Sequence, residues 1–151
     1  MSDIRIENRV EGAPVAGASF GIEDCAALPA DSQVGDVSTL VPGRTGRAVR
    51  LAALIEKAGG ARGARFLNIA SKDSSFAVSL PLAEARDAVV VYALGDGPLP
   101  DAKGGPFRLL VPGHPDECVH VKQVVRLELS DRPGRDTRPV DDAEHAKLHK
   151  K

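Results

Sequence analysis

Hydrophobic and polar positions alternate at both ends of the chain. Near the N-terminus, Ile4 and Ile6 alternate with charged residues, which predicts an opening strand. Apolar and charged residues alternate in the same way from position 125 to position 129. This second alternation predicts a half-buried final strand.

The middle of the chain carries helical and strand signals in turn. Apolar residues at positions 51, 54, 55 and 58 share one face of a predicted helix, which Gly59 would end. Residues 88–94 are continuously apolar, as is typical of a buried strand. Further strands are predicted at 36–41, 66–70, 76–80 and 107–111, short helices at 22–28 and 80–86, a turn at 11–17 and a loop at 95–106. Short helices and irregularly spaced strands in this order predict an α+β domain with a mixed β-sheet.

Composition limits what such a domain can do. A length of 151 residues fits one domain, and a net charge of −1 excludes a globally basic nucleic-acid-binding protein. From position 130 the chain becomes rich in Asp, Arg, Pro and Gly, so we expect a domain at 1–130 and a polar tail at 131–151. No membrane span or signal peptide is apparent, which predicts a cytoplasmic protein with two reduced cysteines and no membrane partner.

Two groups of residues resemble metal ligands in their spacing. His145 and His149 are four residues apart in a helix expected near the C-terminus, but the lysines around them favour a solvated tail. His114, Cys118 and His120 could hold zinc, but no fourth ligand lies nearby in the sequence. We therefore predict no metal site, and a zinc-binding module is the weaker alternative.

Positive charge gathers in two places. The first is a cluster of Arg44, Arg47, Arg50, Lys57, Arg62 and Arg65. Arginine suits bidentate binding of phosphate or sulfate, although a solvated helix face is the simpler interpretation. In the second, Lys103 and Arg108 supply charge, while Gly104 and Gly105 let backbone amides approach an anion. A simple glycine turn is the alternative there.

The second cationic segment is part of an ordered series of motifs. Residues 97–113 contain Gly-Pro-Leu-Pro, then Lys-Gly-Gly-Pro-Phe-Arg, then Leu-Leu-Val-Pro-Gly, and Val121-Lys122 precede the final strand. Together with residues 51–59 and 71–85, this series resembles the sulfite oxidase family of molybdopterin-dependent oxidoreductases. That family has Pro-Leu-Pro, His-Gly-x-Pro-x-Arg and Val-Lys-Trp in the same order.

The resemblance implies a sulfite-oxidase-like fold, in which cationic and backbone groups hold the phosphate and ring of a pyranopterin. By motif, Arg108 and Lys122 match the family's cofactor-contacting Arg and Lys, and Lys103 stands where the family usually has His. The residues predicted to bind molybdopterin are therefore Arg44, Arg47, Lys103, Gly104, Gly105, Arg108 and Lys122.

The sequence departs from the family at the metal ligand. In active members a Cys thiolate binds molybdenum within a segment that corresponds, by element order, to residues 37–44. This segment has no Cys here, since Cys25 lies earlier and Cys118 later. Two hypotheses follow. The first is a molybdopterin-binding oxidoreductase domain, with the missing Cys arguing against catalysis. The second is a non-catalytic module of the same fold that binds an anionic small molecule or a protein partner.

Overall fold

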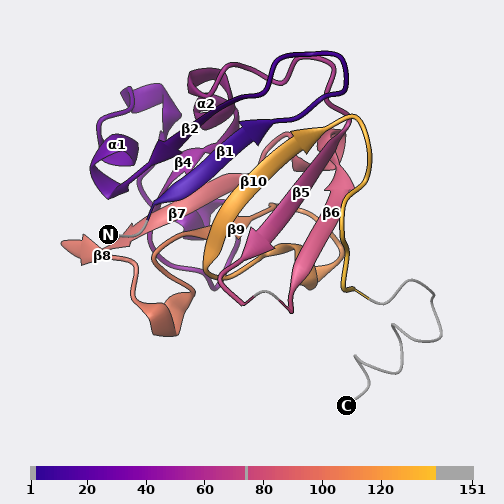
Figure 1. The fold of residues 1–151 in the computed structure, drawn as a ribbon. Coiled ribbons are helices and arrows are strands. Elements are labelled where there is room, and N and C mark those ends of the chain that lie inside the picture. Colours follow the sequence, from indigo (N-terminus) through magenta and orange to yellow (C-terminus); the bar gives the residue numbers. More distant parts are fainter. Residues whose placement is uncertain (1–2, 74, 139–151) are drawn as a thin grey trace.

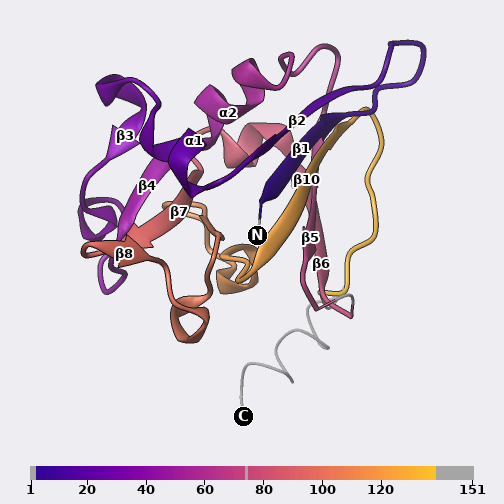
Figure 2. The ribbon, with the colours of Figure 1, turned by 60° about the vertical axis from the view of Figure 1, so that its left-hand side comes forward.

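The alternating segments of the chain form two β-sheets that pack against each other, with short helices at their margins (Figures 1 and 2). The computed structural model describes residues 3–73 and 75–138. The strands are β1 (Ile4–Asn8), β2 (Ala16–Phe20), β3 (Gln33–Val34), β4 (Arg47–Arg50), β5 (Phe66–Ser71), β6 (Ala77–Pro81), β7 (Val89–Leu94), β8 (Gly97–Pro98), β9 (Arg108–Leu110) and β10 (Val124–Ser130). The helices are α1 (Ile22–Ala26) and α2 (Leu51–Lys57), with 3₁₀ turns η1 (Ala30–Ser32), η2 (Val37–Thr39), η3 (Leu82–Ala85), η4 (Asp101–Lys103) and η5 (Glu117–Val119).

The first sheet has the strand order β2-β1-β10-β5-β6 and faces the viewer in Figure 1. β1 and β10 come from opposite ends of the described chain and pair in parallel, with Ile6 opposite Leu127. The other neighbouring strands of this sheet pair antiparallel. Ile4 and Ile6 are fully buried, as their alternation predicts. The parallel pair makes the sheet mixed and confirms the predicted α+β class.

The second sheet has the order β3-β4-β7-β8, and β9 also pairs with β7. Its central strand, β7, is buried on both faces. Val90 and Tyr92 belong to the main core between the sheets, whereas Val89 and Val91 belong to a second, smaller apolar cluster. Burial on both faces accounts for the continuous apolar run that predicted this strand.

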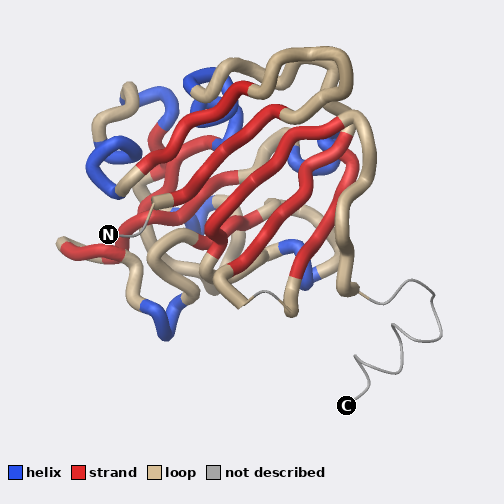
Figure 3. Tube along the Cα trace, in the orientation of Figure 1, coloured by secondary structure: helices blue, strands red, loops and turns tan. Residues whose placement is uncertain are grey.

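The helical segments are short pieces at the margins of the sheets (Figure 3). Leu51 and Leu54 on α2 are buried in the main core, which confirms the predicted apolar face. Gly59 follows this helix with a φ of +114°, a conformation that favours glycine. Among the described residues, no helix has the length and apolar character needed to cross a membrane.

Two predicted elements are short 3₁₀ turns in the structure. The strand expected at 36–41 is instead the turn η2, where the Asp36 carboxylate accepts from the Ser38 amide at 2.9 Å. The helix expected at 80–86 is the shorter turn η3, with no side-chain cap. The Ser79 hydroxyl, which was expected to cap it, donates to a side chain on β5.

Strand β2 was not predicted, because its small residues overlap the expected turn at 11–17. Alanine, glycine and serine have weak strand preference, and pairing with β1 over five residue pairs is what fixes this strand. Tertiary contact therefore overrides local sequence here.

The segment from 131 to 138, expected to open a polar tail, packs along β6. The Gly134 amide donates to Ser79 Oγ at 3.1 Å, and the Thr137 amide donates to a β6 carbonyl at 2.9 Å. The expected C-terminal helix, with His145 and His149, lies outside the described residues.

Candidate anion-binding site

Arg108, the first residue of β9, lines two hollows and lies where they adjoin. β9 pairs with the buried strand β7, which places Arg108 opposite Val91. A Cβ atom on Gly104 would come within 3.0 Å of both Arg108 Cδ and Lys122 Cγ. The absence of a side chain at Gly104 therefore lets two cationic side chains pass close together.

The glycine pair shapes this loop through packing. The Gly104 amide donates to Asp101 and the Gly105 amide to Pro100, each at 2.9 Å, within the turn η4. Both amides thus donate within the loop itself, whereas the sequence led us to expect them to be available to an anion. A Cβ atom on Gly105 would lie 1.8 Å from the Leu99 carbonyl oxygen, so no larger residue fits without movement of the backbone.

The smaller hollow, of about 90 Å³, is positively charged. It is lined by Gly43, Arg44, Thr45, Val91, Leu99, Lys103, Arg108 and Leu110. Three of these residues are cationic and none is acidic, so the local field favours an anion. One water takes up about 30 Å³ of liquid, so the hollow suits a single tetrahedral anion better than a ring system.

The larger hollow, of about 480 Å³, has mixed charge. It is lined by Ser71, Asp73, Ser75, Phe76, Arg108, Glu117, Cys118, His120, Val121, Lys122 and Gln123. Its volume falls within the range of about 300–1,000 Å³ that is typical of cofactor and small-molecule sites. The two hollows together offer a charged recess beside a wider one.

His120 is held as a neutral donor at this site. Its side chain is only 5% exposed, and Nδ1 accepts from the Val111 amide at 3.0 Å. Burial lowers the pKa of His120, the charges of Arg44 and Arg108 lower it further, and Glu117 partly opposes them. With Nδ1 acting as acceptor, the neutral ring carries its proton on Nε2, which lies 3.5 Å from a Glu117 oxygen.

Arg108 carries the clearest sign of a missing partner. Its Nε is buried and has no hydrogen-bond partner among the described residues, while one Nη donates to the His120 carbonyl at a long 3.4 Å. Burial lowers the pKa of Arg108, and the nearby charge of Arg44 lowers it further. A buried donor without an acceptor is unfavourable, so Arg108 keeps a hydrogen-bonding capacity that the described residues do not use.

The family of oxidoreductase molybdopterin-binding domains matches this sequence over residues 45–137, which is more than half of the chain. The chain belongs to this family. The matched region contains Arg108 and Lys122, and the match confirms the family that the motifs at 97–113 indicated.

Among solved structures, the sulfane dehydrogenase SoxCD from Paracoccus pantotrophus resembles this molybdopterin-binding domain in fold. The TM-score is 0.63 at 21% sequence identity, and the alignment covers 87% of this chain and 39% of that one. The chain thus spans about two fifths of that chain's length. No curated protein sequence matches it.

The structure does not bring all the predicted cofactor-binding residues of this domain together. Arg44, Lys103, Arg108 and Lys122 line the two hollows, but Arg47 lines neither. Its guanidinium lies over the ring of Tyr92, 5.9 Å from the ring centroid. The arginine cluster expected between positions 44 and 65 is divided too. Arg44 lines the smaller hollow, whereas the other members of the cluster lie on different segments and line neither hollow.

The cysteines and histidines form no metal site in the described part of the domain. Cys25 is fully buried, and burial raises the pKa of its thiol to about 12. Both ring nitrogens of His114 have hydrogen-bond partners. A carboxylate oxygen of Glu84 lies 2.8 Å from Nε2, and the Asp116 amide donates to Nδ1. Cys118 lines the larger hollow, although the sequence places it far from the expected ligand segment.

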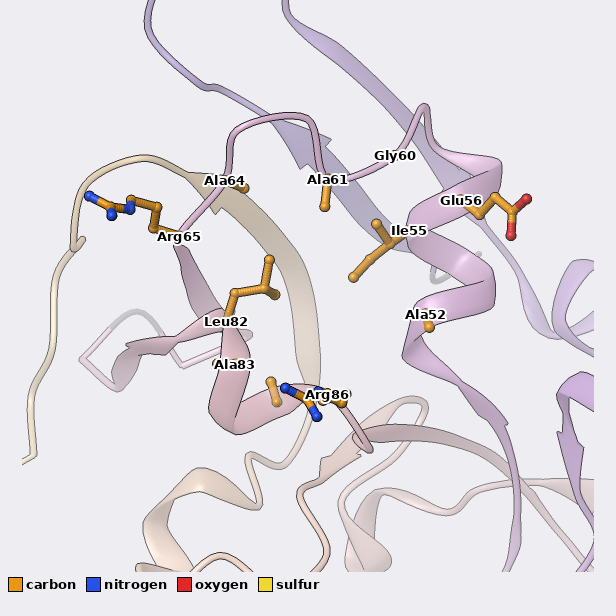
Figure 4. A pocket seen from close by; sticks show the side chains of 11 residues that line it. Ala52, Ile55, Glu56, Gly60, Ala61, Ala64, Arg65, Leu82, Ala83 and Arg86 are labelled. Atoms are coloured by element: carbon orange, nitrogen blue, oxygen red, sulfur yellow. The ribbon is translucent and has the colours of Figure 1, made fainter.

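Another hollow, larger than these two, lies between α2 and η3 (Figure 4) and measures about 660 Å³. Its lining is mostly Ala, Ile and Leu side chains, with Arg65, Arg86 and Glu56 among them. None of the residues predicted to bind the cofactor contributes to it. The unpartnered Nε of Arg108 and the cationic side chains around it make the two hollows that Arg108 lines the candidate site.

Sequence reasoning missed one residue of this site and assigned another differently. Glu117 was not singled out, and His120 was considered only as a zinc ligand. The signal in the sequence that could have revealed both residues is Asp116, a residue type that often caps a helical turn. Its carboxylate accepts from the Cys118 amide at 2.9 Å and so caps the start of the turn η5. This turn presents Glu117 and His120 to the larger hollow.

Proposed function

We propose that this domain binds the molybdenum cofactor and that Arg108 binds the cofactor's phosphate group. One observation carries the proposal: the buried Arg108 Nε has no acceptor among the described residues, although Arg108 lies where two hollows adjoin. A phosphate oxygen would accept from Nε and offset a guanidinium that burial and Arg44 disfavour.

The neighbouring residues have distinct roles in this proposal. Lys122 lines the larger hollow beside Arg108 and adds a second charge to the phosphate. Arg44 and Lys103 extend the positive field through the smaller hollow. The larger hollow accepts the ring system, with Phe76 as an apolar surface and the neutral His120 Nε2 as a hydrogen-bond donor.

The described residues fit the anionic part of the cofactor better than its metal. When bound, the cofactor supplies two-electron redox chemistry at molybdenum. A soft thiolate ligand is missing from residues 37–44. Cys118 lines the larger hollow, but burial and the Asp116 carboxylate raise the pKa of its thiol, which disfavours the thiolate.

The missing thiolate favours a second candidate function. A non-catalytic module of the same fold would keep the anion-binding residues and bind a phosphorylated small molecule, or a protein partner, without metal chemistry. The two candidates share Arg108 and Lys122 and differ in whether molybdenum accompanies the ligand.

Purification from a host that makes molybdopterin tests the first candidate. We expect about one equivalent of fluorescent oxidised pterin per wild-type chain, loss of the pterin in Arg108→Met, and retention in Arg126→Met, which removes an exposed arginine outside both hollows. Pterin without molybdenum would favour the non-catalytic module. Wild-type protein free of pterin under saturating supply would refute cofactor binding.

A further inference from the structure

We infer that Glu117 is a built-in counter-ion of this site, which an anionic ligand must displace and which therefore sets the affinity for that ligand. The inference rests on the proposed anion site at Arg108. It adds a carboxylate that competes with the ligand for the same cationic groups.

The position of the Glu117 carboxylate supports this role. One oxygen lies 3.6 Å from a guanidinium nitrogen of Arg44 and 3.5 Å from Nε2 of His120. The same carboxylate raises the pKa of Arg108, so its charge is felt at the residue that both hollows share. Glu117 thus lies beside Arg44 and His120 and lines the larger hollow together with Arg108, so an external anion there would meet the same cationic groups.

The other acidic residue in the lining faces elsewhere. Asp73 accepts from the Ser75 amide at 3.0 Å and from the Ser75 hydroxyl at 2.7 Å, so its charge is used within its own loop. Of the residues that line the two hollows, Glu117 is therefore the carboxylate directed at the cations.

Glu117 can leave this position without a change of fold. Its side chain is 71% exposed, and ion pairs of this kind contribute little. The turn that carries it is fixed independently, because the Asp116 carboxylate caps the turn and also accepts from Arg138 at 3.1 Å. Displacement needs only rotation of an exposed side chain.

Titration with inorganic phosphate, followed by calorimetry at low ionic strength, tests the inference. Removing one negative charge next to the bound anion should tighten phosphate binding about three- to tenfold in Glu117→Gln. The matched control is Glu84→Gln, which removes the same charge from a carboxylate that also lies beside a histidine but lines neither hollow. We expect this control to bind phosphate as the wild type does, and Arg108→Met to lose binding.

The outcomes separate the inference from the proposed function. Wild-type affinity in Glu117→Gln, or an equal gain in both Gln variants, would overturn the counter-ion role and leave the Arg108 site intact. Absence of phosphate binding in every variant, or binding that survives Arg108→Met, would overturn the anion site and the inference with it.

The pKa of His120, measured by NMR, gives a second readout that does not depend on affinity. Without ligand, this pKa should be lower in Glu117→Gln than in the wild type, because the carboxylate that raises it is gone. Phosphate should then raise the pKa of His120 more in the variant than in the wild type, where one anion replaces another. Equal responses in the two proteins would contradict displacement of Glu117.

Discussion

Replacement of Arg108 by methionine should stabilise the ligand-free domain and abolish its response to anions. Arg108 buries an Nε that has no acceptor among the described residues, and its charge is disfavoured by burial and by Arg44. Methionine keeps an unbranched apolar chain against Gly104 and Lys122 and removes the unsatisfied donor.

The expected gain follows from two opposing contributions. A buried donor without a partner costs roughly 1–3 kcal/mol. Against this, the variant loses the hydrogen bond from Arg108 to the His120 carbonyl, which is long at 3.4 Å. Such a bond contributes about 0.5–1 kcal/mol. The net effect is a free energy of unfolding higher by about 1 kcal/mol, or a Tm higher by about 3 °C for a domain of this size.

Thermal unfolding in phosphate-free buffer, repeated with increasing phosphate, measures both effects. Arg126→Met is the control, because Arg126 is exposed on β10 and its replacement should change stability by about 0.5 kcal/mol or less. Phosphate should raise the Tm of the wild type and of Arg126→Met, since a ligand that binds only the folded state stabilises it. Arg108→Met should not respond.

Two results would refute this reasoning. A Tm below that of the wild type for Arg108→Met in phosphate-free buffer would mean that Arg108 is already satisfied in the free protein. An equal phosphate response in Arg108→Met and the wild type would mean that the anion binds elsewhere.

Three further changes test other parts of the structure. Gly105→Ala should destabilise the domain by about 2–4 kcal/mol in urea unfolding, because the added Cβ would lie 1.8 Å from the Leu99 carbonyl oxygen. A loss of stability below about 0.5 kcal/mol would contradict this packing. Arg138→Gln should lower the free energy of unfolding by about 2–4 kcal/mol, because it breaks a mostly buried ion-pair network with Asp116 and Asp136. The control Arg132→Gln removes an exposed ion pair and should lower it by under about 1 kcal/mol. Equal losses in the two variants would refute the distinction. Folding lowers the pKa of His120, so the contribution of this residue to stability is present above pH 6.5 and is lost as the pH falls below that value. His120→Gln should therefore flatten the pH dependence of the free energy of unfolding in this range. An unchanged slope would contradict this reasoning.

The fold could be predicted where the hydrophobic pattern is strong. Strand β7 and the buried face of α2 follow from apolar runs and helical spacing, and both agree with the structure. Strand β2 could not be predicted in this way, because its small residues gain their stability from pairing with β1. The turn at 37–39 depends on local hydrogen bonds around Asp36, whose carboxylate accepts from the Ser38 amide and hydroxyl and whose carbonyl accepts from the Thr39 hydroxyl. Such bonds compete locally with extended structure.

Four of the residues predicted from the sequence line the two hollows, and three of them lie in or beside the family motifs. Lys103 and Arg108 are close in sequence, and the family resemblance added Lys122. The ion pair between Arg44 and Glu117 joins residues that are far apart in the chain, and the pattern of charges gave no sign of it. Arg47 lines neither hollow, because its position on β4 directs the guanidinium toward Tyr92 on the neighbouring strand.

In the proposed site, Arg108 and Lys122 lie apart from residues 37–42, the larger part of the segment expected to supply a metal ligand, whereas Gly43 and Arg44 at the end of that segment line the smaller hollow. Arg108 and Lys122 are positioned by the close approach of their stems at Gly104, where a larger side chain would meet both at about 3 Å. The segment that would supply a thiolate, residues 37–44, is a turn and loop that is mostly partly or fully exposed. A substitution there can remove a metal ligand and leave the packing at Gly104 unchanged. The cationic site can therefore persist without the thiolate, and molybdenum content and anion affinity should vary independently between variants at residues 37–42, which line neither hollow, and variants at Gly104.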